Sequence, residues 1–196
     1  MKKQLLSGIA LAIAFGISPQ IAYAQTHSHL TDEELQKLMP DFQRQVEYWN
    51  QYEEPERQNE AKAFAENWSR RDLAVAPFLG KWAGWEQTKD IYPSTTDGQV
   101  CIIYTDGTAQ VVSFALGKVL NQRIYDGGGV TFRQGNYVGS AWNNNNPTGE
   151  AGVEAYRLFA PAEMPTHASW RDLPEGYRVI EQFNAAGCIA ELPMKP

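Results

Sequence analysis

The spacing of hydrophobic and polar residues divides the chain into three parts. Residues 5–17 form an almost continuous apolar run. From Leu30 to about Asp72, apolar residues recur every three or four positions, which predicts amphipathic helices. From Phe78 onward the period is two, with turn residues at short intervals, which predicts β-strands. We therefore expect a leader over 1–24, a helical segment over 25–73 and a β domain over 74–196.

The leader has the organisation of a secretory signal peptide. Lys2 and Lys3 precede the apolar run, and Ala22-Tyr23-Ala24 supplies small residues at the spacing of a cleavage site. A membrane-spanning helix needs about 20 apolar residues, so this run is too short for one. No cysteine adjoins Ala24 to carry a lipid anchor. The sequence predicts a protein without a membrane anchor that begins at Gln25 and is periplasmic or extracellular.

The helical segment predicts a hairpin of two helices. Thr31 and Glu34 have the spacing of a capping box at the start of the first helix. Its apolar stripe consists of Leu35, Met39, Phe42, Val46 and Trp49. Pro55 suits the first turn of the second helix, whose stripe consists of Ala61, Phe64, Ala65 and Trp68. We expect these stripes to pack against the β domain; the alternative is a docking face for a partner.

Eight segments of the β domain have the pattern of strands: 78–87, 99–105, 108–115, 118–125, 129–134, 137–142, 152–159 and 176–184. Asp106-Gly107, Gly127-Gly128-Gly129 and Gly135-Asn136 supply turns between them. Short strands with brief connections favour an antiparallel meander, which hides its edges by closing on itself. We predict a mainly β fold, an eight-stranded up-and-down barrel preceded by the helical hairpin. A β-sandwich is the alternative.

Two cysteines, Cys101 and Cys188, occur in a chain addressed to an oxidising compartment. This context favours one disulfide between them. Two free thiols are the alternative, because sequence spacing does not show whether the two residues meet in space. A thiolate metal site is disfavoured, since no histidine lies within ordinary metal-ligand spacing of either cysteine.

The charge of the chain bears on its partners. The formal net charge is −6, and removal of Lys2 and Lys3 with the leader makes the remaining chain more acidic. An acidic protein repels phosphate backbones and anionic membrane surfaces. Nucleic acid is therefore not an expected partner.

The segment Gly80-Lys81-Trp82, on the first predicted strand and preceded by helix, resembles the Gly-x-Trp signature of the lipocalin-like calycin group. The resemblance implies an eight-stranded barrel that binds a small apolar molecule. It also implies structural roles for Trp82 and for Arg178, a basic residue that would pack across the indole from the closing strand. The stretch 79–93 is similar to the start of nitrobindin-type haem barrels. Those proteins have a proximal histidine near the C-terminus, which residues 176–196 lack, so no cofactor is expected.

Aromatic and polar side chains on the predicted strands are candidates for a ligand pocket. Aromatic rings give a pocket large apolar faces with occasional polar tips. Period-two spacing allows Arg123, Glu154, Arg157 and Glu181 to point inward, although solvent-facing positions are the alternative. We predict a ligand-binding set of Tyr104, Tyr125, Tyr137, Trp142, Tyr156, Arg123 and Arg157.

Catalytic and metal motifs are sparse. Ser169, His167 and Asp172 lie close together in sequence, but neighbours on one loop seldom present nucleophile, base and acid to one point, and no Gly-x-Ser-x-Gly elbow occurs. We therefore assign no catalytic residue. Cleavage after Ala24 would expose Gln25-Thr26-His27, an arrangement that can hold Cu(II) or Ni(II) in a square-planar nitrogen site. Cyclisation of Gln25 would remove that site, and we assign no metal ligand.

Three functions fit these features. The leading hypothesis is a secreted or periplasmic barrel that binds a small apolar or amphipathic molecule. The second is an envelope protein-protein module, such as an inhibitor of a wall-degrading enzyme, that uses the Asn143–Gly149 loop or the helices. The third is a barrel-based enzyme that uses inward Glu, Arg and Tyr side chains for acid-base chemistry.

Overall fold

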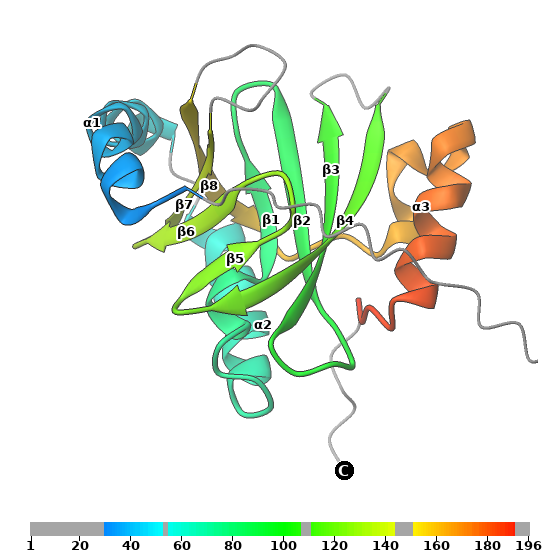
Figure 1. Ribbon diagram of the computed structural model, residues 1–196. Helices are drawn as coiled ribbons and strands as arrows, with labels where there is room; N and C mark the ends of the chain where they lie inside the picture. Colours follow the sequence, from blue (N-terminus) through cyan, green and yellow to red (C-terminus); the bar gives the residue numbers. More distant parts are fainter. Residues whose placement is uncertain (1–29, 53–54, 107–110, 144–150, 191–196) are drawn as a thin grey trace, which may run out of the picture.

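The computed structural model describes residues 30–52, 55–106, 111–143 and 151–190. Its centre is a closed antiparallel barrel in which each strand pairs with the next along the chain and the last pairs with the first (Figure 1). The strands are β1 (Gly80–Ala83), β2 (Gln87–Pro93), β3 (Gln99–Asp106), β4 (Val112–Leu120), β5 (Arg123–Tyr125), β6 (Val130–Gln134), β7 (Tyr137–Trp142) and β8 (Gly152–Ala160). The predicted up-and-down barrel is confirmed, and the sandwich alternative is wrong.

Two helices precede the barrel, α1 (Asp32–Trp49) and α2 (Pro55–Ser69). The capping box between Thr31 and Glu34 starts α1 as predicted. The helix lies along the outer face of β7 and β8, where Leu35 and Phe42 meet Phe132 and Val153. Helix α2 packs on β1 and β8 through Ala61 and Trp68. Both apolar stripes therefore face the barrel, so the packing interpretation of these helices is confirmed.

Helix α1 also completes the closure of the barrel. Strand β1 is short and its pairing with β8 ends at Ala83 and Arg157, so part of β8 extends beyond its neighbour. The Gln45 amide covers this edge: its Oε1 accepts from the Ala155 N–H at 2.8 Å, and its Nε2 donates to the Val153 carbonyl at 2.9 Å. One side chain thus replaces the missing strand partner, which an exposed edge requires.

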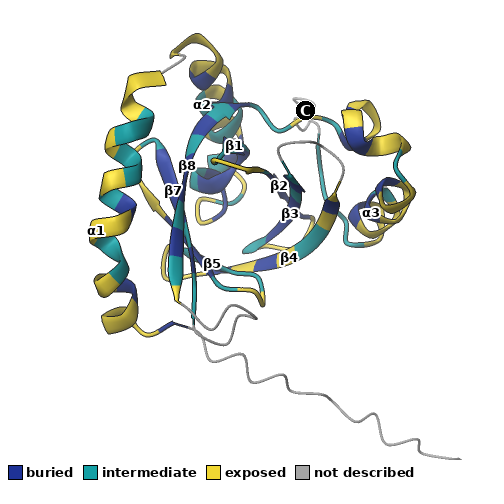
Figure 2. Cartoon of the chain, turned by 90° about the horizontal axis from the view of Figure 1, so that it is seen from above, coloured by how far each residue is buried: buried dark blue, intermediate teal, exposed yellow. Residues whose placement is uncertain are grey.

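A third helix, α3 (Pro174–Ala185), lies on the opposite side of the barrel from α1 (Figure 2). This helix corrects the predicted strand at 176–184. Gly176, Val179 and Phe183 are its buried positions, and their spacing of three and four is helical. Pro174 occupies the first turn, a position that favours helix initiation. Phe183 meets Tyr92 of β2, and a disulfide joins Cys101 of β3 to Cys188 after the helix, as predicted.

Two other strand boundaries differ from the prediction. The segment 78–87 is not one strand, because the chain turns at 84–86 and returns as β2. Strand β4 continues through Gly117, which lies in the gap between the predicted strands 108–115 and 118–125. A Cβ at Gly117 would lie 2.4 Å from Ile124 Cγ2, so this glycine makes room inside the barrel. The turn that follows β4 is at Asn121 and Gln122, both with positive φ.

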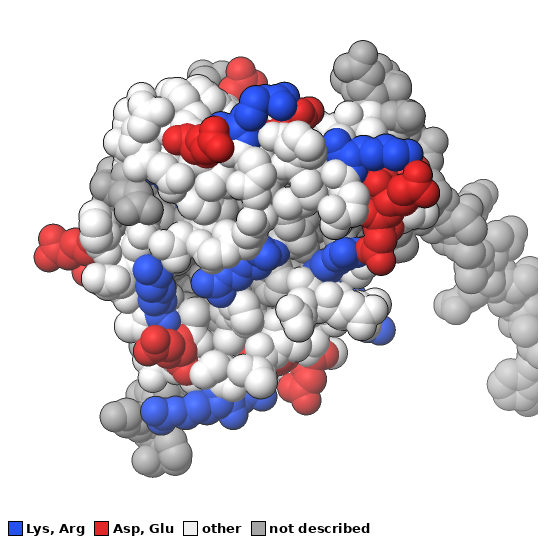
Figure 3. Space-filling view, turned by 90° about the vertical axis from the view of Figure 1, so that its left-hand side faces the viewer, with Lys and Arg blue, Asp and Glu red and all other residues white. Residues whose placement is uncertain are grey.

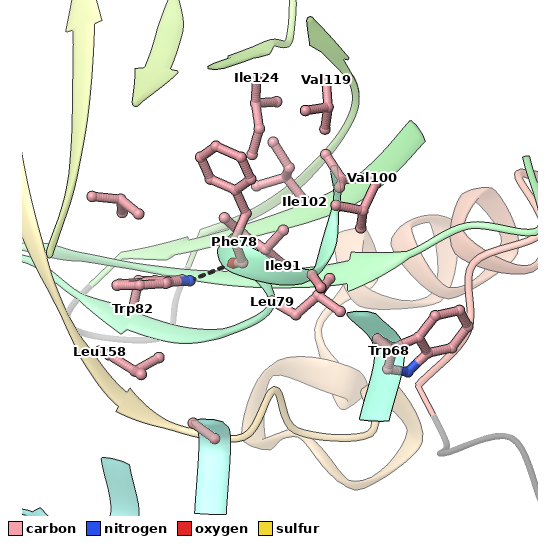
Figure 4. Close-up of a cluster of buried hydrophobic side chains, with 14 of the residues drawn as sticks. Trp68, Phe78, Leu79, Trp82, Ile91, Val100, Ile102, Val119, Ile124 and Leu158 are labelled. Carbon is pink, nitrogen blue, oxygen red and sulfur yellow. Dashed lines mark hydrogen bonds between the residues drawn. The ribbon is translucent and has the colours of Figure 1, made fainter. Parts of the chain in front are cut away.

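Buried hydrophobic side chains pack around Trp82 inside the barrel (Figure 4). Trp82 is fully buried there, and its Nε1 donates to the Phe78 carbonyl at 2.7 Å. The other side chains around it are Leu79, Ile91, Val100, Ile102, Val119, Ile124, Val138 and Leu158.

Candidate functional site

A cavity of about 350 Å³ lies at one end of the barrel. Strands β2, β3, β7 and β8 and the connection from β5 to β6 contribute its walls. Its lining consists of Gln87, Lys89, Tyr104, Asp126, Gly128, Gly129, Ser140, Ala141, Trp142, Glu154 and Tyr156. A hollow of this size holds a small organic molecule.

Lys89 is the most unusual residue of the cavity. Lys89 is two residues from Ile91 on β2, so both side chains point to the same face of the sheet. It is also the register partner of Trp82 on β1. Because Ile91 and Trp82 belong to the core inside the barrel, the Lys89 side chain enters the barrel too. The residue is only 2% exposed. Its Nζ lies 5.0 Å from the centre of the Tyr104 ring and 4.2 Å from that of Tyr156. Within the described part of the chain, no acceptor or carboxylate lies close enough to bond this Nζ.

Burial lowers the pKa of Lys89 to about 8, because the charged ammonium loses its hydration. The negative charges of Asp126 and Glu154 oppose this shift without cancelling it. The two tyrosine rings offer a further, weaker stabilisation of the cation. The amine is therefore partly neutral near physiological pH, unlike a lysine on the surface.

Two tyrosine-carboxylate pairs surround this amine. The Tyr104 hydroxyl donates to Asp126, and the Tyr156 hydroxyl donates to Glu154. Burial is the largest cause that raises the pKa of both tyrosines, and the nearby carboxylates add to it. Both phenols consequently remain protonated donors across the physiological range.

The backbone holds each carboxylate in place. Asp126 Oδ1 accepts from the N–H groups of Gly128 and Gly129 at 3.0 and 3.1 Å. Glu154 Oε1 accepts from the Trp85 N–H at 3.2 Å. A Cβ on Gly84 would lie 2.5 Å from Glu154 Oε1, so only glycine allows the chain to pass this close. These contacts give a preorganised site with one amine and two carboxylates.

The structure divides the predicted ligand-binding residues into two groups. Tyr104, Trp142 and Tyr156 line the cavity. Glu154, which we expected to be able to point inward, also lines it, whereas Glu181 lies on the exposed side of α3. Arg123, Tyr125, Tyr137 and Arg157 do not line this cavity, because they project from the outer face of the barrel.

These four outward residues contact the N-terminal helices or their surroundings. The Arg123 guanidinium pairs with Asp32, close to the start of α1. The Tyr137 hydroxyl donates to Asn50 Oδ1 at 2.7 Å, and the Arg157 guanidinium lies 5.4 Å from the Trp49 ring centre. Tyr125 packs on the cluster beneath α1. Because α1 covers this part of the outer face, polar and aromatic side chains there have contacts with the helix, as inward side chains have contacts inside the barrel.

The predicted contact between Trp82 and Arg178 is also wrong. Arg178 is exposed on α3 and does not belong to the closing strand, which is β8. Trp82 reaches the Phe78 carbonyl instead. Leu158 of β8 is its register partner across the seam where the barrel closes.

The sequence analysis missed Gln87, Lys89, Asp126 and Ser140 as cavity residues. Lys89 was overlooked because β2 was not recognised as a separate strand. A signal was present nonetheless: Lys89 and Ile91 share one parity, and Asp90 and Tyr92 share the other. Asp126 belongs to a turn whose role in holding Tyr104 depends on tertiary contacts.

The remaining sequence candidates lie elsewhere. His167 and Ser169 are exposed on two short turns, and Asp172 contacts Arg171 at 3.4 Å. No group of three His, Cys, Asp or Glu residues with metal-binding geometry occurs among the described residues. Gln25-Thr26-His27 lies outside them, as do the predicted signal peptide and most of the Asn143–Gly149 loop. In the described ranges, no helix has the length and apolar character to cross a membrane.

A larger hollow of about 760 Å³ lies at the opposite end of the barrel, between residues 73–78 and two hairpin turns. The titratable residue in its lining is Arg133. Its guanidinium is already bound: Nη1 donates to the Pro77 carbonyl at 2.6 Å and Nε to the Gly135 carbonyl at 2.9 Å. Arg133 thus ties the segment below the barrel to the β6–β7 turn. We favour the Lys89 cavity because it contains a buried amine that contacts aromatic rings, together with two carboxylates held in place around it.

Comparison with protein-family models, curated proteins and solved structures found no match to this chain. The resemblance to the calycin group therefore stays a prediction, carried by Gly80-Lys81-Trp82 and consistent with the barrel topology.

Proposed function

We propose that this protein binds a small amphipathic molecule in the Lys89 cavity. The main observation behind this proposal is that the Lys89 amine lies in the cavity and has no hydrogen-bond acceptor among the described residues. A ligand that places a hydrogen-bond acceptor at Nζ would satisfy this group, and Trp142 and the tyrosine rings would contact its apolar part.

The charges of the site favour a neutral ligand. Lys89 contributes at most one positive charge, and Asp126 and Glu154 contribute two negative ones. An anionic ligand would gain attraction from the ammonium but would meet two carboxylates in a medium that screens charge poorly. A carbonyl or ether oxygen accepts from the amine without that repulsion. We therefore infer a neutral molecule with a polar acceptor at one end.

The proposed setting is the periplasm or the exterior of the cell. The Cys101–Cys188 disulfide is of a kind that persists in oxidising compartments, and residues 1–24 have the pattern of a secretory signal. On the α1 side of the molecule, charged residues of both signs are scattered among uncharged ones, without a continuous basic area (Figure 3). This distribution gives no reason to propose nucleic acid as a partner.

The binding proposal can be tested with two matched fluorescent probes. N-phenyl-1-naphthylamine is neutral, and 1-anilinonaphthalene-8-sulfonate has the same ring system with an added anionic group. We expect the neutral probe to bind with a Kd at least about tenfold lower, which corresponds to about 1.4 kcal/mol. Fluorescence titration at pH 7 measures both values.

Two tryptophan substitutions provide the control. Ser140→Trp should fill the cavity and abolish binding of the neutral probe, because Ser140 lines it. Ser169→Trp adds the same ring at an exposed turn and should leave binding unchanged. Circular dichroism verifies that both variants are folded. Equal binding by wild type and a folded Ser140→Trp variant would contradict the proposal.

The envelope-partner hypothesis stays a prediction. Residues 144–150 of its proposed contact loop lie outside the described structure. The apolar stripes of α1 and α2, its other proposed surface, pack against the barrel. Native mass spectrometry of the protein purified from its own envelope distinguishes the hypotheses, because a small ligand and a partner protein add very different masses.

A further inference from the structure

We propose that Lys89 is a covalent carbonyl site, at which its amine condenses with an aldehyde or ketone of the bound ligand to form a protonated Schiff base. This inference rests on the proposed binding function and names the ligand class more closely. Its basis is the placement of a nucleophilic nitrogen in the cavity, with two carboxylates and two phenols held around it.

The nitrogen is available for this reaction in a way that other lysines are not. Lys81 of β1 is engaged by Glu163 at 3.4 Å, and Lys37 of α1 by Glu33 at 3.0 Å. Lys118 on β4 projects outward and is exposed. Lys89 alone among these four lines the cavity, and its contacts are ring faces rather than bonded acceptors.

The residues around Lys89 would also stabilise the protonated Schiff base. Its neighbours within the barrel are Trp82 from β1, Tyr104 from β3, Asp126 from the β5–β6 connection, and Glu154 and Tyr156 from β8. A protonated Schiff base has one positive charge at the same nitrogen as the original ammonium. The carboxylate field and the ring faces that accompany the ammonium therefore also stabilise the iminium.

The reaction balances without an oxidant or reductant. The ammonium first releases a proton, and the lone pair of Nζ then forms a bond to the carbonyl carbon. The carbonyl oxygen takes up a proton, which gives a carbinolamine. Loss of that oxygen as water leaves the C=N bond, and the net change is the conversion of ammonium and carbonyl to iminium and water. Desolvation of a lysine in a pocket is a general way to activate it for this step.

Reductive trapping tests the inference on the wild-type protein. Benzaldehyde is the probe, with cyanoborohydride to convert any Schiff base to a stable benzyl-amine, and peptide mass spectrometry locates the adduct. Among the lysines, we expect one benzyl group, on Lys89; a free α-amino group is mapped separately because its ordinary pKa is also about 8. At pH 7 the neutral fraction of an amine with pKa about 8 exceeds that of an amine with pKa 10.5 by about 300-fold, which favours labelling of Lys89.

Two matched variants test whether the adduct requires the amine of Lys89, rather than a positive charge at this position or the reactivity of any lysine. Lys89→Arg keeps the cation but should give no adduct in the cavity. Lys118→Arg should leave the labelling of Lys89 unchanged. Urea-unfolded protein provides the opposite control, since Lys89 and Lys118 should then be labelled equally. The site mapping on wild type does not depend on whether either variant folds.

The outcomes distinguish this inference from the binding proposal. Labelling of Lys89 in preference to the exposed lysines supports the covalent site. Binding of N-phenyl-1-naphthylamine without labelling of Lys89 would overturn the covalent site and leave the binding function standing. Absence of both would overturn the two together. Equal labelling of Lys89 and the exposed lysines in folded protein would also contradict the inference.

Discussion

Replacement of both Cys101 and Cys188 by alanine should lower the free energy of unfolding by about 4 to 5 kcal/mol. The disulfide joins residues 87 positions apart, so it closes a long loop in the unfolded chain. In the chain-entropy description, a loop of this length restricts the unfolded ensemble by about that free energy. Alanine suits position 101 because that side chain is fully buried on the outer face of β3.

Urea denaturation of wild type and the double variant measures this loss. Reductant should lower the stability of wild type to a similar level and leave the double variant unchanged. We also expect faster amide exchange over 174–189 in the variant, because the disulfide fastens the segment after α3 to the barrel. Equal urea midpoints for disulfide-bonded wild type and the double variant would show that the disulfide does not contribute this free energy of unfolding.

Lys89 should make the protein more stable as the pH rises from 8 to 10, by about 2 kcal/mol. Its pKa is about 8 in the folded protein against an ordinary value of 10.5. Between these values the unfolded chain binds the proton and the folded protein does not, so stability increases with pH. The stability gained in this way is complete above pH 10.5, the pKa in the unfolded chain, and it is lost as the pH falls to about 8, the pKa in the folded protein.

Other buried groups act in different pH ranges. Burial raises the pKa of Asp90 to about 6, so its contribution is lost as the pH rises from about 4 to 6. Tyr92, Tyr104 and Tyr156 have pKa values raised by burial, and they oppose the Lys89 effect above about pH 10. The range between pH 8 and 10 therefore isolates Lys89 best.

Urea titrations of wild type and Lys89→Met at several pH values measure this effect. The difference between the two free energies should change by about 2 kcal/mol from pH 8 to 10. Lys118→Met serves as the matched control, because Lys118 is exposed, and its curve should remain parallel to that of wild type. A parallel curve for Lys89→Met would mean that the amine is hydrated, and the cavity site would lose its main support.

The errors in the sequence-based prediction have a common cause, which is that contacts with distant parts of the chain overrode the local sequence pattern. Residues 176–184 have β-propensity in Tyr177, Val179 and Ile180, yet the burial of Gly176, Val179 and Phe183 against the barrel selects a helix. The predicted strands 108–115 and 118–125 left Gly117 between them, although it lies within β4. Its actual role is to leave room for Ile124, which only the closed barrel places opposite it.

The same limit applies to the site. Tyr104 and Tyr156 were predicted because aromatic residues on strands commonly line cavities, whereas Tyr125 and Tyr137 satisfied the same criterion and face α1. Parity shows which residues of a strand share a face. It does not show which face is inside when helices cover the outside as well, because both faces are then largely apolar.

The sequence alone determined the β architecture, the helical start and the cysteine pair, since these depend on periodicity, capping and residue type. Tertiary structure decided where the site is. Lys89 enters the barrel next to Trp82, and the β5–β6 connection and strand β8, both distant in sequence, bring Asp126 and Glu154 to it. The physical reason is that local patterns set each segment, whereas burial and charge at Lys89 depend on strands that meet only when the barrel closes.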